Sequence, residues 1–190
     1  MWTDALRFLI STLFGLVVYT ALLRFVMQWM RAPFRNPLGQ ATMALTDWAV
    51  KPLRRVLPGR GGYDWASLVV AWIGQMFWLA ALAMTGGAPP SGSLAGFVAA
   101  FAIVELIKAS LWIMIVAIFA QAILSWVAPD GPLAGVLNAL TFRVLAPIRR
   151  VLPPLGGTLD LSPLIAIVLL QLVLMLPVAW LEQAVAQFFR

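Results

Sequence analysis

Long apolar segments, separated by two basic loops, dominate the pattern of this chain. The apolar segments cover residues ~8–29, ~67–84, 94–127 and ~162–180. A helix of about 20 apolar residues, rising 1.5 Å per residue, crosses the ~30 Å hydrocarbon core of a bilayer. The pattern therefore predicts an all-α membrane protein with four transmembrane helices.

The third apolar segment is too long for one simple crossing. Its 34 residues, interrupted only by Glu105 and Lys108, would extend about 51 Å as a helix. Two interpretations stay open. Either residues 94–108 lie along the interface and only ~109–127 span the membrane, or one tilted helix projects beyond the bilayer. In both, Glu105 and Lys108 lie three residues apart on a helix, can form an ion pair and would mark the boundary with water.

The first loop, residues 30–65, carries the pattern of a short amphipathic helix. Five apolar residues recur there at spacings of three and four, which places them on one helix face: Leu38, Ala41, Leu45, Trp48 and Ala49. Such a helix, with a tryptophan on its apolar face and arginines nearby, suits the membrane interface. We expect Pro52 to stop or kink it, because proline removes a helical hydrogen-bond donor.

A near-identical heptapeptide occurs twice in the chain. Residues 52–58 read Pro-Leu-Arg-Arg-Val-Leu-Pro and residues 147–153 read Pro-Ile-Arg-Arg-Val-Leu-Pro, so six of the seven positions are identical. Each copy leads through a Gly-Gly pair and an aspartate, Asp64 or Asp160, into an apolar segment. Such self-similarity indicates a duplicated structural unit. The chain is therefore predicted to be two hairpin repeats, residues 1–93 and 94–190.

The distribution of positive charge predicts how these hairpins are oriented. The long loops, residues 30–65 and 128–160, hold nine of the thirteen Lys and Arg residues, whereas the turn at 85–93 holds none. Cytoplasmic loops carry the excess of Lys and Arg, so both long loops are predicted to be cytoplasmic. The result is two tandem hairpins of the same orientation, related by an axis along the membrane normal, with interfacial helices in the loops.

The repeated motif carries the candidate site residues. Of the two adjacent arginines, one can reach a lipid phosphate while the other pairs with the aspartate that caps the next span, and Gly-Gly supplies a tight turn. We expect lipid or partner contacts from Arg54, Arg55, Arg149 and Arg150, and a structural role for Pro52, Pro58, Asp64, Pro147, Pro153, Asp160, Ser162 and Pro163. The arginines either act only as a topogenic stop with headgroup contact, or form a docking site for a cytoplasmic protein or an anionic lipid. Direct nucleic-acid contact is not expected, because stacking aromatics do not alternate with these arginines.

Polar residues within the apolar segments form a second candidate set. The intramembrane positions are Gln75, Gln121, Gln171, Glu105 and Lys108. Alignment of the repeats pairs Gln75 with Gln171, and these side chains either meet in an interhelical hydrogen bond or line a polar pathway with Gln121 and Glu105. Arg24, near the end of the first span, either reaches along the membrane to the headgroups or faces a partner helix.

Composition narrows the possible chemistry. The chain is 63% hydrophobic and 11% charged, with a mean hydropathy of +0.96, which excludes an ordinary water-soluble domain. It has no cysteine and no histidine, so disulfides, thiolate chemistry, His-based catalysis and His- or Cys-ligated metal sites are excluded. The seven acidic residues form no close pair in sequence. We therefore expect no catalysis, no cofactor and no metal.

The repeated motif, with Gly156-Gly157-Thr158-Leu159-Asp160-Leu161-Ser162-Pro163, resembles the YggT (also called YlmG) family over roughly residues 8–84 and 109–183. The first copy differs, with Asp64-Trp65-Ala66-Ser67 at the corresponding place. The resemblance implies a small bacterial or plastid membrane protein, associated with division, nucleoid distribution, assembly of the cytochrome b6f haem or potassium and osmotic homeostasis.

Together these observations lead to an expected function. We expect a non-catalytic scaffold in the bacterial inner membrane whose basic cytoplasmic loops contact lipids and a protein partner, with a homo-oligomer left open. The alternative is a small transporter or channel component, for which the intramembrane polar residues would matter most.

Overall fold

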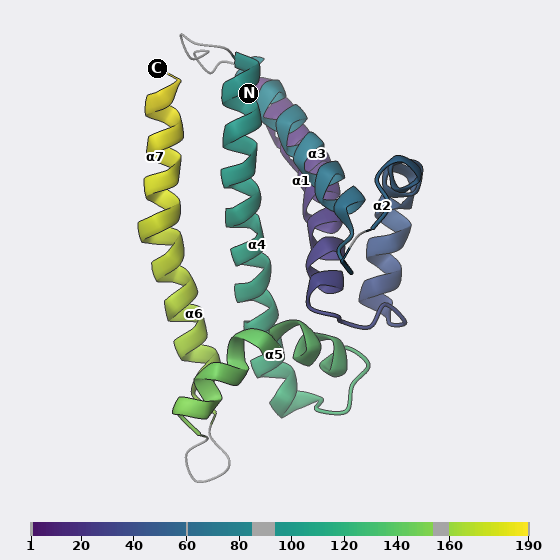
Figure 1. The fold of residues 1–190 in the computed structure, drawn as a ribbon, viewed down its shortest axis with the longest axis vertical. Coiled ribbons are helices and arrows are strands. Elements are labelled where there is room, and N and C mark those ends of the chain that lie inside the picture. Colours follow the sequence, from purple (N-terminus) through teal and green to yellow (C-terminus); the bar gives the residue numbers. More distant parts are fainter. Residues whose placement is uncertain (1, 60, 85–93, 154–159, 190) are drawn as a thin grey trace.

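The computed structural model describes residues 2–59, 61–84, 94–153 and 160–189, and every regular element in those ranges is helical. The elements are α1 (Trp2–Trp29), α2 (Pro37–Val56), α3 (Trp65–Met84), α4 (Leu94–Val127), α5 (Ala134–Val151), α6 (Ser162–Val173), the π-helical turn η1 (Leu174–Val178) and α7 (Ala179–Phe188) (Figure 1). The predicted all-α class is confirmed.

Among the described residues, four helical stretches are long and apolar enough to cross a membrane: α1, α3, α4 and the continuous run Ser162–Phe188. This agrees with a helical membrane protein. The last stretch extends past the predicted end near residue 180, because Pro177 lies within η1 and the helix continues beyond it. A π-helical turn accommodates the missing proline donor without ending the helix.

α4 is one continuous helix of 34 residues, without a break between residues 94–108 and the remainder. Its first turns are held by neighbours. The indole Nε1 of Trp72 on α3 donates to the carbonyl of Ala99 at 3.1 Å, and the rings of Phe97 and Phe189 pack edge to face. These contacts keep the extra length of α4 in line with its remainder.

Helix α4 lies between the other helices of the first half and those at the C-terminal end of the second half (Figure 1). α1 and α3 pack together on one side with α2 beside them, and α6 with α7 lies on the other side. α5 crosses the end of the molecule opposite the two chain termini (Figure 1). One core cluster joins α1, α2, α3 and α4, and a second joins α1, α4, α5 and α6.

Pro52 and Pro147 lie inside α2 and α5, so of the two expected effects of Pro52, a stop or a kink, the stop is wrong. Each ring removes the donor for a carbonyl four residues earlier. The last turn of each helix is nevertheless held by its neighbours. The residue after the proline, Leu53 or Ile148, packs against a core cluster, and the arginine after that forms an ion pair. Pro58 and Pro153 follow the ends of these helices.

α2 turns a small, mostly polar face toward the protein. Gly39, Thr42, Thr46 and Val50 are buried, whereas Trp48 on the predicted apolar face is 67% exposed. Threonine hydroxyls can be buried here because they donate to the carbonyls of their own helix, as Thr46 Oγ1 does to Thr42 at 2.6 Å. Leu45 on the same face is exposed too, whereas Leu38 and Ala49 are half-buried against the core clusters, so the predicted apolar face is only partly turned outward.

Candidate functional site

Each half of the molecule holds an ion pair between a short helix and the start of the next long helix. Arg54, in the last turn of α2, pairs with Asp64 just before α3. Arg149, in the last turn of α5, pairs with Asp160 through Nε and Nη2, both 2.9 Å from Oδ2. The first arginine of each doublet is thus fixed against the aspartate that precedes the next helix.

Both aspartates also accept hydrogen bonds from a serine at the start of the long helix. Asp64 accepts from the Ser67 hydroxyl at 2.5 Å and from its amide at 3.4 Å. Asp160 accepts from the Ser162 hydroxyl and from its amide at 2.9 Å. The serine stands three residues after the aspartate in one half and two in the other. The sequence difference between the copies therefore preserves the same chemical partner.

The first pair is part of a larger buried network. Arg24 is only 4% exposed, and its Nη1 donates to Thr46 and to Asp47, both at 2.8 Å. Its Nε lies 3.4 Å from Oδ2 of Asp64, which is 1% exposed. Arg24 therefore faces partner helices, and the alternative in which it extends to lipid headgroups is wrong in this structure.

The second pair lacks this network. With Trp29 aligned to Trp126, Gln121 takes the place of Arg24, and with Thr46 aligned to Thr141, Phe142 takes the place of Asp47. The second half thus has a neutral residue at each of the two positions that form the Arg24–Asp47 ion pair in the first half. A cavity of about 490 Å³ lies there, lined by Gln121, Ala122, Ser125, Trp126, Arg149, Asp160 and Pro163.

The ion pairs shift the ionisation of two carboxyl groups. Burial raises the pKa of Asp160, but the hydrogen bonds from Ser162 and the charge of Arg149 outweigh it, so the pKa lies below its ordinary value. The hydrogen bond from Lys51 lowers the pKa of Asp47, and Arg24 adds to this effect against the opposing effect of burial. Both groups are therefore anionic at neutral pH.

The second arginine of each doublet is exposed. Arg55 and Arg150 form no ion pair within the described part of the chain, and each lies next to an arginine that does. Of the four arginines singled out from the sequence, two are tied to aspartates and two present free guanidinium groups.

The intramembrane polar residues are not brought into one pathway. Lys108 Nζ lies 3.0 Å from Glu105 and 2.5 Å from Glu182, so the predicted pair is present and joins α7 as well. Gln75 is buried on α3 and Gln171 lies on α6, with no hydrogen bond between them among the described residues. Figure 1 places α3 and α6 on opposite sides of α4.

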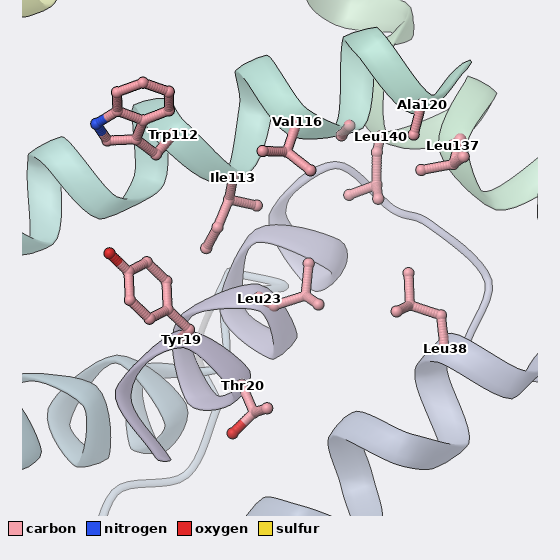
Figure 2. A pocket seen from close by; sticks show the side chains of 11 residues that line it. Tyr19, Thr20, Leu23, Leu38, Trp112, Ile113, Val116, Ala120, Leu137 and Leu140 are labelled. Atoms are coloured by element: carbon pink, nitrogen blue, oxygen red, sulfur yellow. The ribbon is translucent and has the colours of Figure 1, made fainter. Parts of the chain in front are cut away.

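An apolar cavity of about 550 Å³ lies between α1 and α4. Figure 2 shows Tyr19 and Leu23 facing Trp112, Ile113 and Val116 across it. Apart from the hydroxyls of Tyr19 and Thr20 its lining is almost wholly apolar and carries no Asp, Glu, Lys or Arg, so it suits a hydrocarbon chain better than a reacting group. The residues that the structure covers also include no cluster of His, Cys, Asp or Glu able to hold a metal ion.

Sequence reasoning missed several members of these networks. Asp47 and Glu182 had no assigned partner, and Gln121 was considered only as part of a pathway. Alignment of Arg24 with Gln121 across the halves is a signal that the sequence carries, but its meaning requires knowing that both positions face the aspartate before the next helix.

Comparison with known proteins gives consistent matches. The model of the CCB3/YggT family matches residues 3–85 and again residues 100–181. A Pseudomonas aeruginosa protein, "Uncharacterized protein PA0392", is 38% identical over 171 residues, covering 89% of this chain and 86% of that protein. "Uncharacterized protein YggT" of Escherichia coli K12 is 36% identical over 171 residues, 90% of this chain and 87% of that protein. A Vibrio alginolyticus protein in the proC 3′ region is 36% identical over 172 residues, 88% and 90% of the two chains. No solved structure matches the chain.

Proposed function

Because this chain belongs to the CCB3/YggT family, we propose that it is a non-catalytic membrane scaffold or assembly protein. Its two basic loops contact anionic lipid and a protein partner at one membrane face, the cytoplasmic face of a bacterial inner membrane. The family resemblance favours a partner in cell division, nucleoid distribution or assembly of a membrane complex.

The proposal rests on the difference between the two arginines of each doublet, of which one is ion-paired and the other is exposed. Arg54 and Arg149 are tied to Asp64 and Asp160, which orients the last turn of α2 and of α5. The neighbouring Arg55 and Arg150 are then presented outward on a fixed helix end. A guanidinium group on a fixed backbone loses less conformational freedom on binding than one on a mobile backbone, so it suits recognition of a phosphate or carboxylate.

The spacing of charged residues supports membrane placement of each half. From Ser162 to Glu182 the last apolar run rises about 30 Å, which equals the thickness of the hydrocarbon core. From Arg7 to Arg24 α1 rises about 26 Å. In each half an apolar length of one membrane thickness thus separates two levels of charge.

A comparison of variants tests the scaffold proposal. Crosslinking in native membranes followed by affinity purification should recover a partner with the wild type and lose it when Arg55→Gln and Arg150→Gln are combined. Arg143→Gln is the matched control, because Arg143 is exposed on α5 but lies outside the doublet. Unchanged recovery with the double variant would contradict the proposal.

The alternative, a small transporter or channel component, predicts a different result. The purified protein alone would then support ion flux into liposomes. Flux that is lost on Gln121→Leu or Gln171→Leu, with partner recovery unaffected by the arginine variants, would favour that alternative.

A further inference from the structure

The cavity beside Arg149 and Asp160 contains a buried polar atom for which the described residues supply no partner. The Oε1 atom of Gln121, which lines it, is buried and has no hydrogen-bond partner within the described residues. A buried acceptor without a donor costs free energy that a bound donor recovers. The cavity volume of about 490 Å³ lies within the range of small-ligand pockets.

The first half shows which chemical group belongs at this place. There the guanidinium of Arg24 contacts Asp64, together with Arg54, and fills the space beside the start of α3. In the second half Asp160 has one arginine, Arg149, and Gln121 replaces the second cation. The cavity therefore lacks one cationic hydrogen-bond donor next to a carboxylate.

The lining also contains a positive group and an aromatic ring. The guanidinium of Arg149 has five donors, of which two are used on Asp160, so it retains donors for an anion. Trp126 is 76% exposed and presents its indole ring to any cation near the cavity. A ligand with a positive group and a negative group close together would satisfy both ends of the site.

We infer that this cavity binds the headgroup of a zwitterionic phospholipid with a primary ammonium group, of the phosphatidylethanolamine class. The ammonium group donates to Asp160 and Gln121, and the phosphate accepts from Arg149. The surroundings favour a lipid over a protein side chain. Acyl chains can pack against exposed apolar residues of the elements that carry the lining: Ile123 on α4, Leu161 directly before α6 and Leu164 on α6.

This inference deepens the lipid contact of the proposed function and rests on its membrane placement. It does not depend on a protein partner, so the two can fail separately. If the arginine doublets recruit no partner but the cavity retains the lipid, only the scaffold proposal fails. If partner recovery is intact but no lipid is selected, only this inference fails.

The decisive variant is Gln121→Arg, which recreates in the second half the cation of the first half. The full-length protein is reconstituted in nanodiscs containing equal amounts of phosphatidylethanolamine, phosphatidylcholine and phosphatidylglycerol. It is then released into detergent and its retained lipids are measured by native mass spectrometry. Wild type should retain phosphatidylethanolamine about tenfold over phosphatidylcholine, as expected for one charge-assisted hydrogen bond. Gln121→Arg should abolish this preference, because its own guanidinium occupies the site.

Controls separate loss of the site from loss of the fold. Gln171→Leu removes a different amide of the second half and should keep the lipid preference. Gln121→Arg should elute at the same size as wild type, and if it does not, Trp126→Leu provides the second test with an expected reduction in preference. Equal retention by all variants, or a preference for phosphatidylglycerol, would overturn the inference. A photoreactive residue at Ser125 that crosslinks in native membranes to a protein, rather than to lipid, would do so too.

Discussion

At the scale of single residues, the two halves surround the aspartate before the long helix with different numbers of charges. Asp64 is deeply buried and is matched by Arg24 and Arg54, with Asp47 balancing Arg24. Buried charges are tolerated only when they are paired and hydrogen-bonded, so the first network must change as a unit. The loss of Arg24 and Asp47 together in the second half follows this rule.

The sequence could predict the pairing of an arginine with the aspartate, because both follow the same motif in each copy. It could not predict that Arg24 joins them. Arg24 is 40 residues from Asp64, and only the packing of α1 against α3 brings the two together. The serine partners are also hidden in sequence, because Ser67 and Ser162 stand at different spacings from their aspartates.

Acidification should weaken the second site in a defined direction. The folded-state pKa of Asp160 lies below the ordinary value of 3.8, so its contribution to stability is complete above that value and is lost as pH falls through the folded pKa. The difference in thermal stability between wild type and Asp160→Asn in detergent should be constant from pH 7 to about 5 and shrink below pH 4. A difference that grows on acidification would contradict this assignment. Ser125→Ala, at an exposed position of the same cavity, is the control and should show no such trend.

At the scale of elements, the predicted helices exist, and the errors lie at prolines and ends. Continuous apolar runs located the long helices, since such a run specifies a helix in a membrane. The sequence pattern predicted a stop or a kink at Pro52 because propensity alone disfavours proline within a helix by about 3 kcal/mol. Tertiary contacts of the residues that follow Pro52 and Pro147 outweigh this local preference, and such contacts are not visible in a local pattern.

The start of α2 depends on a glycine. Gly39 donates its amide to the Asn36 side chain at 2.9 Å, and a Cβ at this position would lie 2.5 Å from the carbonyl oxygen of Phe34. Because that neighbour is backbone, Gly39→Ala should destabilise the protein by about 1–3 kcal/mol. The measurement is unfolding in mixed micelles followed by circular dichroism.

Gly135, near the start of α5, provides the matched control for this prediction. A Cβ added there meets nothing within 4 Å, so Gly135→Ala should be neutral or slightly stabilising. Equal destabilisation by both substitutions would contradict the assignment of the effect to the close approach of Phe34, because helix propensity alone favours alanine over glycine.

At the scale of the whole molecule, the arrangement of the halves departs from a simple two-fold relation. Trp65, directly after Asp64, shares a cavity wall with Ser110 of α4, whereas Asp160 shares one with Gln121. These levels are separated by about eleven residues, or about 17 Å along α4. Repeat alignment predicts which residues correspond, but it says nothing about how the halves pack, since that depends on side chains outside the repeat.

This offset links the orientation of the molecule to the tilt of α4. For both arginine doublets to meet one membrane face, α4 must be inclined to the membrane normal. Its length of 34 residues, about 51 Å, is greater than an upright crossing needs and accommodates such a tilt. A cytoplasmic position of both loops and a strongly tilted α4 therefore stand or fall together.

Cysteine labelling can decide this point directly, because the chain has no cysteine of its own. Single cysteines at Arg55 and at Arg150 should both react with a membrane-impermeant maleimide in inside-out vesicles and not in intact spheroplasts. A cysteine at Trp2, which is 91% exposed at the other end of α1, should show the reverse. A cysteine at Val116, exposed in the middle of α4, should react in neither preparation, because hydrocarbon excludes the reagent and keeps the thiol protonated. Labelling of positions 55 and 150 from opposite sides would show that α4 stands upright, that the halves do not share an orientation, and that only one arginine doublet is available to a cytoplasmic partner.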